Sequence, residues 1–169
     1  FAENFPANYV PPTGVDKWVP FGMHVCLQPF WCSHSPLIEG DTIEAISPAP
    51  PEFSSVPGSI FYDNGFEVYD TGINLTAEEM TIALYWADGG GTFTPAGHSV
   101  SMLHNILFDG SADLEVANVA YAKLGIALSD AFLACWKSKF IYNLCRPVTY
   151  IREYIDSTWL PLISTPPFP

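Results

Sequence analysis

The residues best suited to chemistry in this sequence are cations near its C-terminal end. Six Lys and Arg stand against 18 Asp and Glu, yet four of the six fall close together: Lys137, Lys139, Arg146 and Arg152. Lys139 and Arg146 are seven residues apart, so a helix would place both on one largely apolar face. Cations on such a face need anionic partners. Two interpretations remain open: separate salt bridges with acidic residues, or one tetrahedral oxyanion held by both cations.

The element that must position these cations is the longest helix that the sequence predicts. Ser111 can cap its start. An apolar stripe then follows at steps of three and four residues: Leu114, Ala117, Tyr121, Leu124 and Leu128. No strong breaker occurs before Pro147, so the pattern indicates a helix of about 30 residues, or about 45 Å.

Three shorter helices are expected before it. Aromatic residues at helical spacing indicate the first: Tyr62, Phe66 and Tyr69. Thr76 and Glu79 form a capping box that opens the second, which runs to about Asp88 and stops at three glycines. The third starts near Gly97 and ends at a turn over residues 109–110.

Residues 1–58 differ from the rest, because most of the 16 prolines lie there. Proline fixes φ and removes a backbone donor, so we expect an irregular arm packed on the core formed by residues 59–169. No alternating strand pattern of useful length occurs. The sequence therefore predicts an all-α fold, a helical bundle with a proline-rich irregular N-terminal arm.

Composition limits the possible partners and compartments. A net charge of −12 argues against nucleic acid or an anionic membrane surface. No run of eighteen apolar residues occurs, so we expect no membrane-spanning segment. The chain begins with Phe1 rather than Met, which suggests a processed N-terminus and favours a secreted or periplasmic protein.

The four cysteines leave the redox compartment open. Cys26 and Cys32 are close enough in sequence to form a disulfide, and two unlinked thiols are an equal alternative. No C-x-x-C spacing occurs, so a zinc site is not expected.

Three segments in order carry a family resemblance. The K-x6-R-P pattern lies within SDAFLACWKSKFIYNLCRPVTYIR and resembles the first motif of the vanadium-dependent haloperoxidase and type 2 phosphatidic acid phosphatase superfamily. LTAEEMTIALYWADGGGTFTPAGH is similar to an upstream helix and turn of vanadium chloroperoxidases, and WLPLISTPPFP to the stretch leading into their second motif, P-S-G-H. The resemblance covers roughly residues 59–169, and it implies the N-terminal part of a chloroperoxidase- or acid phosphatase-like helical domain.

The resemblance implies roles for five residues. Lys139 and Arg146 would be catalytic, binding the equatorial oxygens of vanadate or phosphate. Trp136 and Phe168 would line a halide pocket, and Asp88 would pair with an oxyanion-binding arginine that lies outside this sequence. Each has a plainer alternative: the two aromatics are core residues, and Asp88 caps the glycine turn. No metal ligand is implied in this chain, and the cofactor would be vanadate, or none in a phosphatase.

Two further matches receive no catalytic role. TPAGHSVS imitates P-S-G-H, but it precedes the K-x6-R-P pattern, so His98 is expected simply at a helix start. Asp130 also matches the family but lies off the predicted face of Lys139. Cys145 departs from the aromatic residue often found before R-P, which puts the shape of the pocket in doubt.

The resemblance stops just before the second motif, and the third motif, S-R-x5-H, does not occur. A companion chain or a missing C-terminal half would therefore supply the S-G-H and R-x5-H residues. We expect it to cover an apolar patch around Phe132, Tyr142 and the final PPFP.

Three functions follow from the resemblance. The favoured one is a vanadium-dependent haloperoxidase-like enzyme that oxidises halide with peroxide, this chain supplying half of the site. The long chloroperoxidase-like match and Trp136 support it. The alternatives are an acid phosphatase that hydrolyses phosphomonoesters, and a non-catalytic helical subunit with a vestigial anion site.

Overall fold

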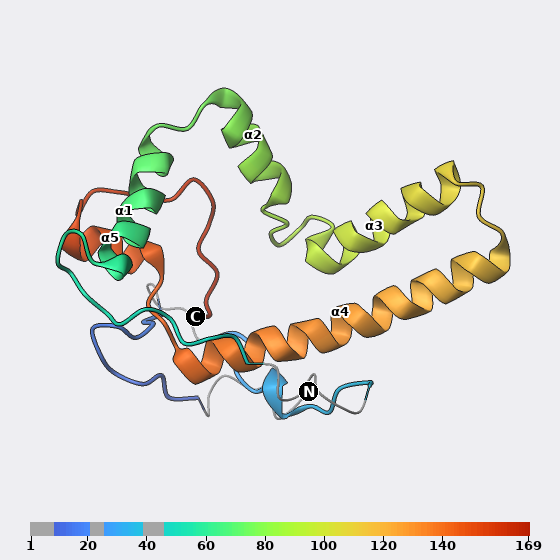
Figure 1. The fold of residues 1–169 in the computed structure, drawn as a ribbon, viewed down its shortest axis with the longest axis horizontal. Coiled ribbons are helices and arrows are strands. Elements are labelled where there is room, and N and C mark those ends of the chain that lie inside the picture. Colours follow the sequence, from blue (N-terminus) through green and yellow to red (C-terminus); the bar gives the residue numbers. More distant parts are fainter. Residues whose placement is uncertain (1–8, 21–25, 39–45) are drawn as a thin grey trace.

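The computed structural model describes residues 9–20, 26–38 and 46–169, which fold into five α-helices and one short 3₁₀ helix (Figure 1). Within these ranges the only extended pairing is an isolated bridge between Lys17 and Leu144. The prediction of an all-α fold is therefore confirmed.

The longest helix, α4, spans Leu114–Tyr142 and differs from the prediction at both ends. Asp113, not Ser111, caps its start, since the Asp113 side chain accepts the N–H of Val116 at 2.8 Å. Its far end is Asn143, whose left-handed backbone (φ 46°, ψ 42°) stops the helix before Pro147. The helix thus ends before it reaches Arg146.

Arg146 belongs instead to the next helix, α5 (Pro147–Tyr154), where it is the N-terminal cap residue. Proline at the first helical position is favourable, because that residue's N–H would have no helical partner. From the sequence, Pro147 was expected to break a helix, so α5 was not predicted.

The three shorter helices agree with the sequence. They are α1 (Ile60–Ile73), α2 (Ala77–Trp86) and α3 (Thr94–Asp109). Both halves of the predicted capping box between Thr76 and Glu79 are present. The helix expected near Gly97 begins three residues earlier, and Pro95 lies in its first turn.

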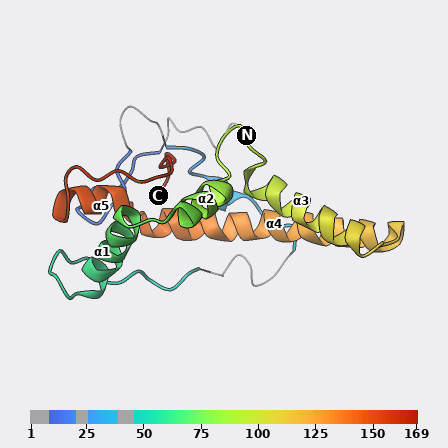
Figure 2. The ribbon, with the colours of Figure 1, turned by 90° about the horizontal axis from the view of Figure 1, so that it is seen from above.

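The core lies where α5 meets α1. Val148, Ile151 and Trp159 are buried together, and Tyr69 of α1 packs against them. Gly65 counts against a helix by propensity, but here it admits Tyr150, since a Cβ at this position would lie 2.7 Å from that ring. At the other end of the molecule, α3 follows the N-terminal part of α4 in both ribbon views (Figure 2).

The described parts of the arm contact the C-terminal half of α4 and the turn after it. The N–H of Trp18 donates to the carbonyl of Asn143 at 2.7 Å, and that of Cys145 donates to Asp16 at 2.8 Å. Trp18 is only 2% exposed. The buried Asp130 carboxylate accepts two arm N–H groups, from Leu37 and Ile38. Asp130 thus anchors the arm.

Exposed apolar side chains occur in the arm and on the helices. On α3 and the start of α4 they include Ile106, Phe108, Leu114, Val116 and Val119. By contrast, Phe132 and Tyr142, where an exposed patch was expected, are half-buried. The arm covers part of the expected patch, through Trp31 against Phe132 and Ser47 against Tyr142, and the partner expected to pack there stays a prediction.

By length and composition alone, α4 is long and apolar enough to cross a membrane, although its sequence has no unbroken apolar run of that length. A core helix of a soluble protein meets the same criterion. The expectation of no membrane-spanning segment therefore stays a prediction.

Candidate oxyanion site

The head groups of Lys139 and Arg146 meet at the end of the chain. Lys139 Nζ donates to the carbonyl oxygen of Pro169 at 2.8 Å. Arg146 donates to the carbonyl of Phe168 through both Nε (2.8 Å) and Nη2 (2.6 Å), and Nη2 lies 3.4 Å from that of Pro169. The two cations converge, as the sequence predicted, but through the turn at Asn143 rather than along one helical face.

Neither cation has a carboxylate partner in the described part of the chain. The ion pairs found there are Lys17 with Asp16 and His98 with Asp88. The described residues therefore do not support the interpretation of separate salt bridges. Backbone carbonyls satisfy the donors without neutralising them, so two positive charges stand side by side and half-buried.

Burial affects both cations in the same direction. It lowers the pKa of Lys139, and the nearby charge of Arg146 lowers it further, while Cys135 acts weakly in the opposite sense. Burial likewise lowers the pKa of Arg146. An anion bound between the two head groups would offset these costs, since an opposite charge favours the protonated form.

Aromatic rings cover one side of the cations. Lys139 Nζ and Arg146 Cζ lie 5.2 and 4.9 Å from the centre of the Phe168 ring, within the range of cation–π attraction. The Trp136 ring is 4.8 Å from that of Phe168 and stacks on Phe132 at 4.0 Å. The structure thus brings Trp136 and Phe168 beside the cations, and their role as a halide pocket stays a prediction.

A cavity of about 620 Å³ lies on another side of the cations. Its walls come from α4, the turn after it and the arm, and include Ser47, Pro48, Pro50, Ser138, Lys139, Tyr142 and Arg146. Two hydrogen bonds hold the arm wall in place: Tyr142 Oη donates to the carbonyl of Ser47 at 2.6 Å, and the N–H of Ser47 donates to Ser138 Oγ at 3.1 Å. Sequence reasoning missed this wall, and the only signal for it was the proline-rich SPAPP run.

Asp88 does not line the cavity beside Lys139 and Arg146. Its carboxylate lies at the junction of α2 and α3, 2.9 Å from Nδ1 of the buried His98. His98 was expected only as a residue at a helix start, and no local pattern indicates its pairing with Asp88. A carboxylate has about four acceptor sites, so the expected arginine outside this sequence can still share Asp88. That second partner stays a prediction.

All four cysteines are free thiols in the structure, so Cys26 and Cys32 are not linked. Burial raises the pKa of Cys26 and of Cys145 to about 11, which keeps both protonated and poorly reactive at neutral pH. Within the described ranges, no group of three or more His, Cys, Asp and Glu could hold a metal ion.

Comparisons with known proteins agree with this picture. A family model described as the VCPO second helical-bundle domain matches residues 119–161, which include Trp136, Lys139 and Arg146. A comparison with curated proteins gives no match. The match and the fold together show that the chain resembles the N-terminal part of a vanadium haloperoxidase.

One structural match is to the crystal structure described as the first bacterial vanadium-dependent iodoperoxidase. The two chains share 30% sequence identity with a TM-score of 0.87, and the match covers 94% of this chain. It covers 41% of the iodoperoxidase, so this chain spans less than half the length of that protein.

Proposed function

We propose that this chain supplies half of the active site of a vanadium-dependent haloperoxidase-like enzyme. The observation that carries the proposal is the convergence of Lys139 and Arg146 on one point without a carboxylate partner among the described residues. Two adjacent half-buried cations form a strong site for a multiply charged oxyanion. Phosphate and vanadate share that tetrahedral shape, and the family match favours vanadate.

The residues present fit vanadate. Lysine carries three N–H donors and arginine five, which is more than the carbonyl oxygens of Phe168 and Pro169 require. When bound, vanadate supplies a Lewis acid that activates peroxide toward attack by halide. Lys139 and Arg146 would hold the negative charge of the oxyanion through charge-assisted hydrogen bonds. Trp136 and Phe168 would exclude water beside it.

The rest of the site would come from outside this sequence. The match to less than half of the iodoperoxidase supports a missing C-terminal half, or a companion chain, that brings the S-G-H and R-x5-H residues. A secreted or periplasmic location remains part of the proposal.

One observation favours an acid phosphatase as the second candidate. The 620 Å³ cavity beside Lys139 and Arg146 has room for the organic group of a phosphomonoester. The cations would then stabilise the transferring phosphoryl group, and no cofactor would be needed.

The test uses the complete protein, with this chain and the remaining motifs together. After loading with vanadate, it should brominate or iodinate a dye only when peroxide and halide are both present, and excess phosphate should suppress the reaction. If the loaded protein never halogenates but hydrolyses p-nitrophenyl phosphate with vanadate as inhibitor, the phosphatase is the correct function. Loss of both activities would leave the non-catalytic subunit with a vestigial anion site.

A further inference from the structure

A second cluster of reactive side chains lies at the junction of α2 and α3, apart from Lys139 and Arg146. His98 is only 6% exposed, and its Nδ1 lies 2.9 and 3.1 Å from the two carboxylate oxygens of Asp88. Its Nε2 lies 3.2 Å from Tyr85 Oη. A carboxylate, an imidazole and a phenol therefore form one continuous row of hydrogen bonds.

The order of these groups fixes where the protons lie. An ionised carboxylate only accepts, so Nδ1 of His98 carries the hydrogen that is donated to Asp88. In the neutral imidazole, Nε2 is then an acceptor, and the hydroxyl of Tyr85 donates to it. The phenolic proton of Tyr85 thus has a base already in place. If it moves, the imidazolium formed is stabilised by Asp88.

Trp86 favours the same transfer. Its ring stacks on the His98 ring with centroids 4.6 Å apart and planes 15° apart. The face of an indole attracts a cation, so it favours the imidazolium over the neutral ring. The base and the carboxylate are shielded from water, whereas Tyr85 is 62% exposed and open to reagents. The cluster therefore presents an exposed phenol that is hydrogen-bonded to a buried base.

We propose that Tyr85 is a modification site for electrophilic halogen, with His98 as its general base and Asp88 as the residue that positions His98. With hypoiodous acid, a ring carbon next to the Tyr85 hydroxyl forms the new C–I bond while the I–O bond breaks and its electron pair leaves as hydroxide. His98 Nε2 takes the hydroxyl proton as the ring attacks. The hydroxide then takes the displaced ring proton, and His98 returns its proton to the phenol oxygen. The net change is a phenol and hypoiodous acid giving an iodophenol and water.

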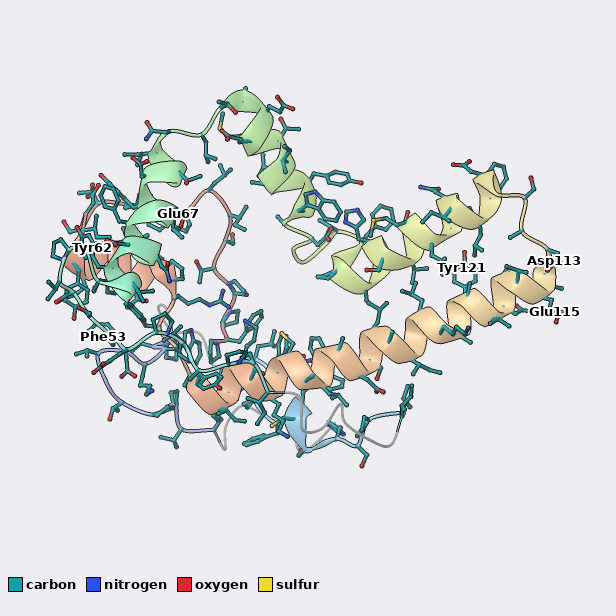
Figure 3. All side chains as sticks on the ribbon, in the orientation of Figure 1. Phe53, Tyr62, Glu67, Asp113, Glu115 and Tyr121 are labelled. Carbon is teal, nitrogen blue, oxygen red and sulfur yellow. The ribbon has the colours of Figure 1, made fainter. Side chains whose placement is uncertain are left out.

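The chain carries a second tyrosine beside a histidine, although Tyr121 is less exposed than Tyr85, so the change of the rate ratio in His98→Gln is the deciding comparison. Tyr121 of α4 points toward α3, where its Oη lies 3.3 Å from Nδ1 of His104 (Figure 3). No carboxylate bonds to His104 among the residues that the structure describes. Tyr121 therefore has an imidazole neighbour without the group that fixes its tautomer and stabilises its charged form.

The experiment treats the purified complete protein with an excess of triiodide over its thiols and follows iodination of each tyrosine by peptide mass spectrometry, so that Tyr85 is tested with the remaining half in place. It needs no vanadate or peroxide, so it is independent of the proposed function. We expect Tyr85 to react at least about tenfold faster than Tyr121, which is the low end of a general-base effect. His98→Gln keeps a hydrogen-bonding side chain without the base, and it should bring the two rates close together with Tyr121 unchanged.

Asp88→Asn tests the positioning role. This variant should slow the iodination of Tyr85. In the ¹⁵N spectrum of His98 it should also remove the preference for a proton on Nδ1, a change that loss of packing alone would not cause. Equal rates at Tyr85 and Tyr121 in the wild-type protein would overturn the proposal. So would an unchanged rate ratio in His98→Gln with helical circular dichroism retained. If that variant unfolds, the wild-type rate ratio and the Asp88→Asn spectrum decide the matter.

Discussion

Lys139 and Arg146 donate to the same oxygen atom, the carbonyl oxygen of Pro169, from the end of α4 and the start of α5. The residue between them that makes this possible is Asn143, which turns the chain with a left-handed backbone and is only 4% exposed. Without that turn, a helix continuing to Pro147 would carry the Arg146 backbone further along the axis of α4. The geometry of the site therefore depends on one asparagine.

Replacing Asn143 should separate the effects of its backbone and its side chain. Asn143→Gly keeps the turn but loses two side-chain hydrogen bonds, one that Asn143 Oδ1 accepts from Tyr9 Oη and one that Nδ2 donates to the carbonyl of Phe140, at a cost of about 1 kcal/mol of unfolding free energy each. Asn143→Ala adds about 1–2 kcal/mol for a left-handed alanine. Phosphate affinity, measured by calorimetry, should fall in Asn143→Ala and stay near wild type in Asn143→Gly. Equal affinities in the two variants would show that the turn does not position the cations.

Oxyanion binding should depend on Lys139 and not on charge in general. Lys139→Ala removes a charge-assisted hydrogen bond worth about 1.5–3 kcal/mol, which corresponds to roughly ten- to a hundredfold weaker vanadate binding. Lys123→Ala removes the same charge from an exposed position on the same helix and should leave the affinity within about twofold of wild type. Equal losses in the two variants would point to a diffuse electrostatic effect instead of a site.

Trp136 should affect halide use more than oxyanion binding. Trp136→Phe keeps an aromatic wall against Phe168 but loses the hydrogen bond from Nε1 to the carbonyl of Gln28, at a cost of about 1 kcal/mol in stability. Trp136→Ala opens the wall and should raise the KM for halide of the complete enzyme about tenfold or more, while vanadate affinity changes little. A similar loss of vanadate affinity in both variants would mean that Trp136 is a core residue that shapes the whole site.

The sequence predicted the parts of the fold that local signals determine. The capping box of Thr76 and Glu79 acts within four residues, and it appears as expected. Long-range features were harder to predict. The arm wall at Ser47 depends on contacts with Tyr142, nearly a hundred residues away, which no local pattern encodes. The prediction of where α4 ends was wrong for another reason. Asparagine is not a strong helix breaker, and it takes the left-handed conformation only in particular contexts.

In the candidate site, too, local features could be predicted from the sequence and long-range contacts could not. The types and spacing of Lys139 and Arg146 left separate salt bridges and a shared anion open; the two cations do converge, although the helical reason given for their convergence was wrong. The pairing of Asp88 with His98 could not be read from either residue alone, because it depends on how the glycine turn folds. Sequence therefore found the residues that carry charge, and structure was needed to find their partners.

The last prediction concerns pH. Burial and the charge of Arg146 lower the pKa of Lys139 below its ordinary value of 10.5. In the window between the lowered and the ordinary pKa, the unfolded chain binds more protons than the folded one, so this group's contribution to stability rises with pH there. Below that window, the cost of burying the charged ammonium is fully present.

Anion binding should change in the opposite direction, because it needs the charged lysine. Phosphate affinity should therefore fall as pH rises through the lowered pKa, before an ordinary lysine would lose its proton. Lys139→Arg supplies the control, since a guanidinium keeps its charge over this range. Calorimetric titration with phosphate, from neutral pH to just above the ordinary lysine value, should show an alkaline loss of affinity in the wild-type protein and a much smaller one in Lys139→Arg. If both proteins lose affinity at the same pH, a group other than Lys139 controls the site.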